Sequence, residues 1–254
     1  MDFRKKLFGG PSTRLLFEHI PKCGGTSLWR FLQNQYSHSV TFHVSGKNPT
    51  EDIQRFQEMP ANARSKFRLV AGHGAHNLIP FVGDAFVKFT VLREPVDRVI
   101  SYYYYIKRRP NHARHQEITE NISSLKAYLE SGKDGFMNNN YIRRFGPGTY
   151  PELIKDPNSA IEQTFASMIE KFDHIGILEE MKELMGVLHQ SVSFSTPYDG
   201  ARENVTQKRP GAEEFDAEVL ELIQAMNAAD IALYERVKAH WSSERQENQS
   251  KHAK

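Results

Sequence analysis

A glycine-rich turn near the start of the chain combines residue types that bind phosphate. Residues 21–27 read Pro-Lys-Cys-Gly-Gly-Thr-Ser, between an apolar run and a helical pattern. Glycines let an anion approach the backbone, and the N–H groups of a helix N-terminus point at one spot, with the positive end of the helix dipole. Lys22 adds a charge, and Thr26 and Ser27 add hydroxyl donors. The turn predicts a phosphate site, although Gly-Gly before Thr also fits an ordinary turn with a helix cap.

The same turn lacks the arrangement that phosphoryl transfer from a nucleoside triphosphate requires. A Walker A loop has its lysine after the glycines and directly before Ser or Thr. Here Lys22 precedes the glycines, and the most apolar predicted strand is followed by Arg93 where an Asp ligand of Mg²⁺ would stand. A loop that binds phosphate without organising a metal argues against γ-phosphoryl transfer. It suits a donor whose leaving group is a nucleotide phosphate.

A second anion site is predicted after that strand. Arg93 lies at its carboxyl end, where open α/β sheets bind ligands, and Ser101 follows about two helical turns later. An arginine and a serine that converge there would bind a second phosphate. Alternatively, Arg93 pairs with Glu94 or Asp97 in a surface cluster. Two separate phosphate sites would indicate a nucleotide that carries phosphate at two positions.

Together these segments resemble the sulfotransferases that use 3′-phosphoadenosine-5′-phosphosulfate (PAPS). The similar stretches are HIPKCGGTSL and VLREPVDRVISYYYY, in this order and about 70 residues apart. The second is most similar to the heparan and uronyl 2-O-sulfotransferase branch and its bacterial relatives. Weaker similarities at 174–180, at 204–209 and at Asn227, Asp230 and Tyr234 extend the resemblance over roughly residues 15–237.

The resemblance implies a role for each motif residue. Lys22 would contact the sulfonate and stabilise the leaving phosphate, and Arg93 and Ser101 would hold the 3′-phosphate. The residues that would surround the 5′-phosphate are Cys23, Gly24, Gly25, Thr26 and Ser27. Those that would close over the adenosine end are Thr206, Lys208 and Arg209. The donor would be PAPS, the nucleotide product adenosine 3′,5′-bisphosphate, and no metal would be required.

Cys23 departs from the family pattern, in which threonine is usual at this place. A thiol at a helix N-terminus beside Lys22 is expected to be more acidic than a free thiol, and therefore sensitive to alkylation. Alternatively, Cys23 only replaces another small side chain.

Two histidines in residues 72–76, Gly-His-Gly-Ala-His, are candidates for the base that transfer to a hydroxyl requires. Heparan-type relatives have His-Gly-His here, which matches His73 and leaves His76 displaced by one residue. His73 is therefore the predicted base, and His76 a substrate contact or substitute. Either could instead be a loop histidine bonded to the backbone. A two-histidine metal site is not favoured, since the spacing to Asp84 fits no common pattern. His19 is expected inside the first strand, with a structural role.

Apolar patterning predicts the elements that must position these residues. Strands are expected at 15–20, 40–44, 67–71, 86–92 and 174–177, and helices from 26, at 51–59, from 96, and at 118–129, 161–172, 179–188 and 215–241. The alternation indicates an α/β, P-loop-like three-layer fold with a mostly parallel central sheet flanked by helices. We expect one domain over 1–241, with an acceptor-side insertion at 108–148 and a disordered tail at 242–254.

Composition limits the function classes. The 254 residues include 33 Lys plus Arg and 31 Asp plus Glu, a net charge of +2, which argues against a nucleic-acid-coating protein. One cysteine excludes an intramolecular disulfide, and no apolar run is long enough to span a membrane.

We expect a cytoplasmic sulfotransferase acting on a hydroxyl acceptor, a carbohydrate or small metabolite, which can be anionic. The basic run 107–115 beside Tyr102–Tyr105 would line the acceptor cleft or form a solvated face. The alternatives are a non-catalytic nucleotide-binding module of this fold and a P-loop small-molecule kinase.

Overall fold

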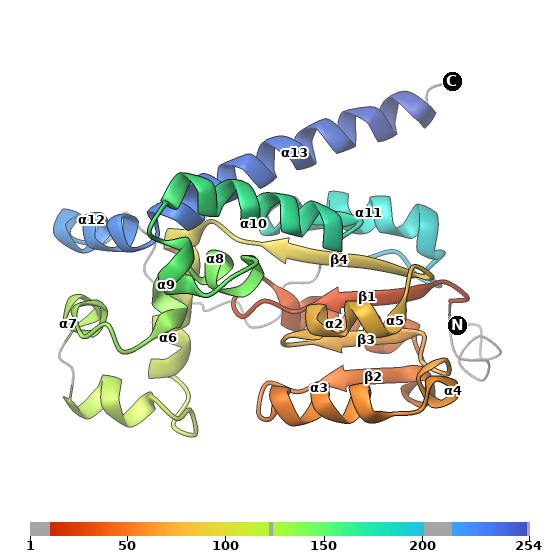
Figure 1. Ribbon diagram of the computed structural model, residues 1–254, viewed down its shortest axis with the longest axis horizontal. Coiled ribbons are helices and arrows are strands. Elements are labelled where there is room, and N and C mark those ends of the chain that lie inside the picture. Colours follow the sequence, from red (N-terminus) through yellow and green to blue (C-terminus); the bar gives the residue numbers. More distant parts are fainter. Residues whose placement is uncertain (1–10, 122–123, 201–214, 253–254) are drawn as a thin grey trace. The chain divides into compact units, whose positions relative to one another are not determined.

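The computed structural model describes residues 11–121, 124–200 and 215–252 (Figure 1). Its five strands form one parallel sheet in the order β2-β3-β1-β4-β5. The strands are β1 (Arg14–Glu18), β2 (Thr41–Val44), β3 (Leu69–Gly72), β4 (Phe86–Leu92) and β5 (His174–Ile177). The predicted fold class is confirmed, because the sheet is parallel and helices connect its strands.

Two of the five strands match their predicted bounds, and the other three, β1, β2 and β3, differ from them by one or two residues at their ends. The apolar runs at β4 and β5 begin and end where the sequence predicts. β1 ends at Glu18, which pairs in register with Gly72 of β3, so His19 lies beyond the strand. The prediction that His19 is a strand residue is therefore wrong: the chain turns toward Pro21 just after the last sheet pair.

The α-helices of the described residues occupy the connections between strands and the region after β5. They are α2 (Gly25–Gln35), α3 (Pro49–Glu58), α4 (Ala61–Arg64), α5 (Ile79–Val82), α6 (Pro95–Lys107), α7 (Leu125–Glu130), α8 (Asn140–Phe145), α9 (Tyr150–Leu153), α10 (Pro157–Lys171), α11 (Met181–Val192), α12 (Ala217–Met226) and α13 (Ala228–His252). The connection from β1 to β2 and the return from β2 to β3 run in opposite directions across the sheet. Right-handed crossovers therefore place α2 and α3 on opposite faces, which gives a helix, sheet and helix arrangement.

Two predicted helices are interrupted. In place of one helix over 118–129, the described residues form a π-helical turn at Glu117–Asn121 and the short α7. The helix expected over 215–241 breaks at Asn227, whose buried side chain binds Met137 O and the N–H of Asn139. This polar contact outweighs the continuous helical pattern of the sequence.

The last helix also extends beyond Trp241, where the sequence predicts its end. α13 is helical as far as His252, through most of the segment expected as a disordered tail. Trp241 donates to Glu180 through its indole N–H at 2.9 Å, and the Arg245 guanidinium pairs with the same carboxylate. These contacts anchor the helix on both sides of the predicted boundary.

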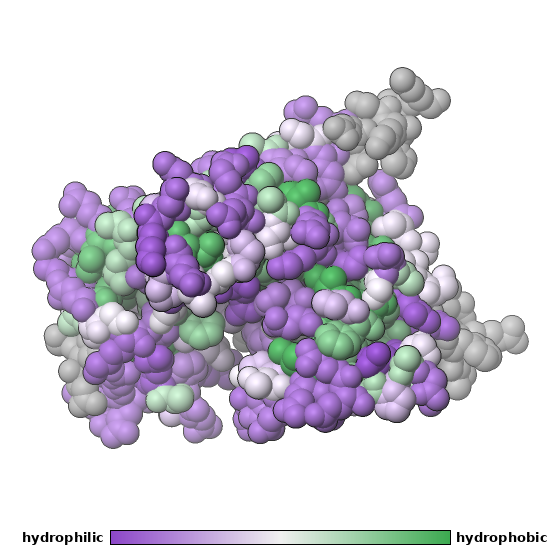
Figure 2. Space-filling model, viewed as in Figure 1, coloured by the Kyte–Doolittle hydropathy of each residue, from purple (hydrophilic) through white to green (hydrophobic). Residues whose placement is uncertain are grey.

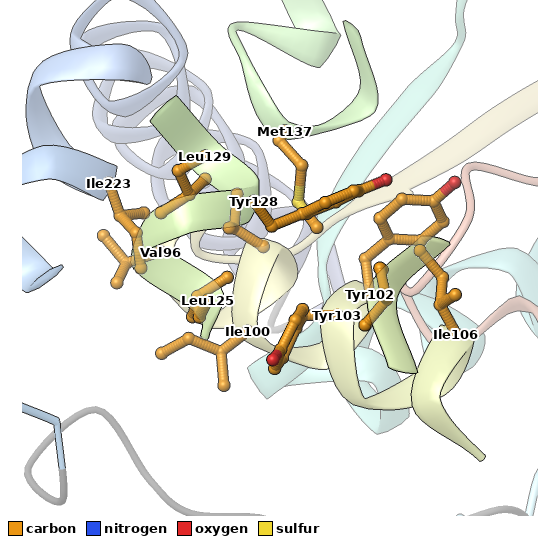
Figure 3. Close-up of a cluster of buried hydrophobic side chains, with 12 residues drawn as sticks. Val96, Ile100, Tyr102, Tyr103, Ile106, Leu125, Tyr128, Leu129, Met137 and Ile223 are labelled. Atoms are coloured by element: carbon orange, nitrogen blue, oxygen red, sulfur yellow. The ribbon is translucent and has the colours of Figure 1, made fainter. Parts of the chain in front are cut away.

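The chain divides into two compact units, each with its own core. The first comprises 1–92, 169–205 and 240–254 and contains the whole sheet; the second comprises 93–168 and 206–239. Buried side chains of the first unit include Leu16, Phe42, Val44, Phe56, Val70 and Phe86. In the second unit, Tyr102 and Tyr103 of α6 pack with Tyr128 and Leu129 of α7 (Figure 3). The face seen in Figure 2 is mostly hydrophilic, with small hydrophobic patches, as a mean hydropathy of −0.59 implies.

Gly72 is the position at which the sheet tolerates no side chain. Its φ is 137°, and a Cβ there would lie 2.0 Å from the carbonyl oxygen of Val44. We predict that Gly72→Ala lowers the free energy of unfolding by about 3 kcal/mol or more, from strain and overpacking together, measured by urea denaturation. The control is Gly186→Ala at an exposed position of α11, where a Cβ meets nothing within 4 Å and should raise the free energy of unfolding by about 1 kcal/mol. An unchanged urea midpoint in Gly72→Ala would contradict this account.

Candidate functional site

The turn between β1 and α2 exposes an uncapped helix N-terminus. Gly24, the N-cap residue, has φ 75° and provides no side-chain hydrogen bond, and the first turn of α2 contains no acidic residue. Lys22 also adopts a left-handed backbone, with φ 72°. A non-glycine residue in that region costs about 1–2 kcal/mol, a strain that concentrates at functional sites. The geometry is that of a site for an anion, with a lysine held directly before it.

The two glycines of the turn are also required by packing. A Cβ at Gly24 would lie 2.6 Å from Leu178 Cδ1, and one at Gly25 would lie 1.9 Å from His19 Cδ2. Close packing therefore explains these glycines without a ligand, as the ordinary-turn interpretation requires. The same contacts fix the turn against the histidine that follows β1.

Two histidines stack beside the turn. The rings of His19 and His73 have centroids 4.3 Å apart and an interplanar angle of 29°. They follow β1 and β3, which are neighbouring strands, so the parallel register brings them together. His73 also lies against Gly46, where a Cβ would be 2.9 Å from His73 Cδ2. His19 thus links the predicted base to the glycine turn in the first unit.

His76 lies in a different setting, against a fully buried carboxylate. Its Nδ1 is 3.0 Å from Glu18 Oε2, and its backbone N–H donates to the same oxygen at 2.9 Å. The N–H of Gly74 donates to the other oxygen at 3.2 Å. Glu18 has no exposed surface, and its two carboxylate oxygens accept two backbone N–H groups of the segment after β3. The Glu18 carboxylate therefore holds the His76 ring on its Nδ1 side.

Arg93 and Ser101 belong to the second unit. The Arg93 guanidinium donates to Asp97 from Nε at 2.6 Å and pairs with it through a second nitrogen, the ion pair that the sequence leaves open as an alternative. Glu94 caps α6 by accepting the N–H groups of Val96 and Asp97. Ser101 lies within α6 and is buried. A phosphate at Arg93 would therefore share or replace an existing carboxylate partner.

The remaining predicted residues have simpler positions. Cys23 is buried, with its Sγ 3.8 Å from the carbonyl oxygen of Pro21, whereas Thr26 is exposed. Thr206, Lys208 and Arg209 lie outside the described residues.

The aromatic run beside the basic segment serves mainly the core of the second unit. Tyr102 and Tyr103 are buried there, and Lys107 lies over the Tyr103 ring at 5.4 Å from its centroid. Arg114 pairs with the buried Asp134, which also accepts from the Tyr128 hydroxyl at 2.7 Å. These contacts within the unit explain much of the run 102–115 without a role in binding an acceptor substrate.

Sequence reasoning missed Glu18 as a site residue and assigned His19 only a structural role. A signal for Glu18 was present, since an acid follows three apolar residues at the end of a strand and needs a partner if the strand is buried. Its partners lie more than 50 positions away in the sequence and follow from strand pairing.

Comparison with known proteins identifies the family. The model of a family described as the sulfotransferase family matches residues 6–235, so the chain belongs to that family. It is also similar to a solved structure, a sulfotransferase from Alicyclobacillus acidocaldarius, with 15% sequence identity, 90% of this chain and 96% of that chain covered, and a TM-score of 0.40. No curated protein matches the sequence. None of the helices in the described residues has the length and apolar character of a membrane span.

Glu18 provides a direct test of how the site is held. We predict that Glu18→Ala lowers the free energy of unfolding by about 3 kcal/mol, because it leaves the buried N–H groups of Gly74 and His76 without their acceptor. Glu18→Gln retains one acceptor oxygen and should cost less. Denaturant titration of the three proteins measures the order. Equal stability of Glu18→Ala and wild type would show that the segment after β3 is held by other contacts.

Proposed function

We propose that the protein transfers a sulfuryl group from PAPS to a hydroxyl group of an acceptor, with a sulfate ester and adenosine 3′,5′-bisphosphate as products. Membership of the sulfotransferase family supports sulfuryl transfer in general. The observation that most supports the donor is the uncapped N-terminus of α2, with Lys22 directly before it.

The residues of the β1–α2 turn fit the charged end of this donor. Uncapped N–H groups and the dipole of an eleven-residue helix favour an anion, and the first turn has no acidic side chain to repel it. When bound, PAPS supplies a sulfuryl group attached to a phosphate leaving group. Lys22 would neutralise charge that develops on that phosphate, and the residues around it would be Cys23, Gly24, Gly25, Thr26 and Ser27.

Recognition of the 3′-phosphate is assigned to Arg93 and Ser101, as the family resemblance implies. Arg93 suits this role because a guanidinium matches the geometry of phosphate as it does that of the Asp97 carboxylate it now binds. Thr206, Lys208 and Arg209 are proposed to contact the adenosine end.

The proposed base is His73. It would accept the acceptor's hydroxyl proton while the oxygen forms its bond to sulfur and the bond from sulfur to the leaving phosphate breaks. Its stacking on His19, which itself packs against Gly25, supports this choice because it connects the ring to the anion-binding turn. His76, oriented by Glu18, is proposed as an acceptor contact or as the substitute base.

The acceptor is proposed to be a carbohydrate or small metabolite, and residues 108–148 are proposed to shape its binding site. Within the family, the chain is proposed to be most similar to the heparan and uronyl 2-O-sulfotransferase branch. A cytoplasmic location is proposed with it. The competing functions are a non-catalytic nucleotide-binding module and a small-molecule kinase. Turnover separates the first from an enzyme, and Mg²⁺-dependent use of ATP identifies the second.

Ligand-dependent stabilisation tests the donor. We predict that adenosine 3′,5′-bisphosphate raises the melting temperature, by an amount that corresponds to about 2.7 kcal/mol at a hundred times its dissociation constant. ADP and Mg·ATP, which lack the 3′-phosphate, should have a much smaller effect. Thermal denaturation with each nucleotide measures this. Stabilisation by Mg·ATP alone would replace the proposal with a kinase.

Substitutions test the assigned roles. Lys22→Ala and His73→Ala should each lower turnover by about a hundredfold or more while the protein stays folded, because one loses charge stabilisation and the other the base. Arg93→Ala should mainly raise KM for the donor. His38→Ala is the matched control, since His38 precedes β2 and so lies at the opposite end of the sheet. Turnover of His73→Ala near the control's value would exclude His73 as the base.

A further inference from the structure

The hydroxyl of a buried tyrosine hydrogen-bonds both the backbone N–H and the backbone carbonyl oxygen of Arg93. The Tyr141 hydroxyl accepts the N–H of Arg93 at 3.0 Å and donates to the carbonyl oxygen of Arg93 at 2.7 Å. Arg93 is the first residue after β4, whose pairing with β5 ends at Leu92. One phenol thus provides the partners that a neighbouring strand would otherwise supply. The residue proposed to recognise the 3′-phosphate has its backbone fixed by a side chain 48 positions away.

Tyr141 is itself fixed by a buried carboxylate. The N–H of Tyr141 donates to both oxygens of Asp230, at 3.0 and 2.9 Å, and the N–H of Ile142 donates to one of them at 3.0 Å. Both Tyr141 and Asp230 have no exposed surface. Asp230 therefore serves as the acceptor for the first turn of α8, the helix that carries the phenol.

A buried arginine lies against the same pair. The guanidinium of Arg98 is 1% exposed and lies over the Tyr141 ring, 5.5 Å from its centroid. Burial raises the pKa of the Asp230 carboxyl to about 6, while Arg98 and the N–H donors favour its charged form. The carboxylate is therefore largely ionised above that pH and can accept the N–H groups of α8.

Asn227, at the break between α12 and α13, holds the segment that precedes α8. Its side chain accepts the N–H of Asn139 at 3.1 Å and donates to the carbonyl oxygen of Met137 at 2.8 Å. In return, the Asn139 side chain accepts the N–H of Asp230 at 3.0 Å. Asn227 and Asp230 belong to one of the weak family similarities in the sequence, and the contacts show what the two residues do: they hold the segment that leads into α8.

We propose that Asn227 and Asp230, acting through Tyr141, are positioning residues that set the direction of Arg93 for the 3′-phosphate. This inference rests on the proposed function. The guanidinium has two fixed points, the backbone held by Tyr141 and the Asp97 carboxylate. Loss of the first lets the backbone of Arg93 move, so the arginine meets a 3′-phosphate in the correct orientation for a smaller fraction of the time.

The test compares two nucleotides that differ only in the 3′-phosphate. Calorimetric titration with adenosine 3′,5′-bisphosphate and with adenosine 5′-monophosphate gives the preference for the bisphosphate as a ratio of dissociation constants. In Tyr141→Phe we expect the bisphosphate to bind about tenfold more weakly, which corresponds to about 1.4 kcal/mol, and the monophosphate to bind unchanged. In turnover, the donor KM should rise while kcat at saturating donor stays near the wild-type value.

The matched control is Tyr128→Phe. The Tyr128 hydroxyl is also buried and belongs to the same unit, but it donates to the Asp134 carboxylate at 2.7 Å and not to the backbone of Arg93. Its loss should leave the preference unchanged. Asp230→Asn tests the carboxylate that holds Tyr141, because it keeps the shape of the side chain and removes its charge. If Tyr141→Phe does not fold, this second variant tests the positioning role. We expect the same selective loss in Asp230→Asn.

The outcomes separate this inference from the proposed function. A wild type that binds both nucleotides equally refutes the donor assignment itself. If the wild type prefers the bisphosphate and Arg93→Ala abolishes that preference, the donor assignment stands. The positioning role is then overturned if the folded variant keeps the wild-type preference, or if it loses affinity equally for both nucleotides, which is the result expected of a merely structural tyrosine.

Discussion

The parallel register of β1 with β3 is the constraint on which the first unit's site depends. It sets Glu18 opposite Gly72, so each strand ends at the same level and each is followed at once by a histidine. A slip of one residue would separate the stacked rings of His19 and His73 and would turn the Glu18 side chain to the other face of the sheet. Gly72 also permits the pairing of β3 with β2 on its other edge, because its bare backbone passes within contact distance of Val44.

Both units use the same physical device, a fully buried carboxylate that gathers backbone N–H groups. Glu18 accepts those of Gly74 and His76, and Asp230 accepts those of Tyr141 and Ile142. Each acid has an internal positive or titratable partner, His76 in one case and Arg98 in the other. Buried charges of this kind are costly unless they are paired and hydrogen-bonded, so each fixes the geometry of a short segment strongly. In both cases the fixed segment leads to a residue proposed to act in catalysis or donor binding.

The residue pattern within each segment predicted the elements that form from local preferences, such as strands bounded by turn residues. The runs at β4 and β5 are apolar and bounded by turn residues, and their limits were predicted correctly. The glycine turn, the helix after it and the parallel sheet followed from the same kind of signal. The break at Asn227 could not be predicted, because the helical periodicity is continuous there and only contacts with residues 137–139 interrupt it. The pairing of Glu18 with His76 and the bonds from Tyr141 to Arg93 join distant positions, which one sequence without strand register does not reveal.

Lys22 shows a conflict between local preference and position. Glycine or asparagine would suit a left-handed backbone better than a lysine does, and the residue lies between a strand and a helix that each favour other conformations. A sequence chosen for folding alone would not place a long cationic side chain there. If Lys22 acts on the donor as proposed, its ammonium group and not its backbone is the reason for this residue, and the peptide unit at Lys22 is one point at which the chain gives up stability for chemistry.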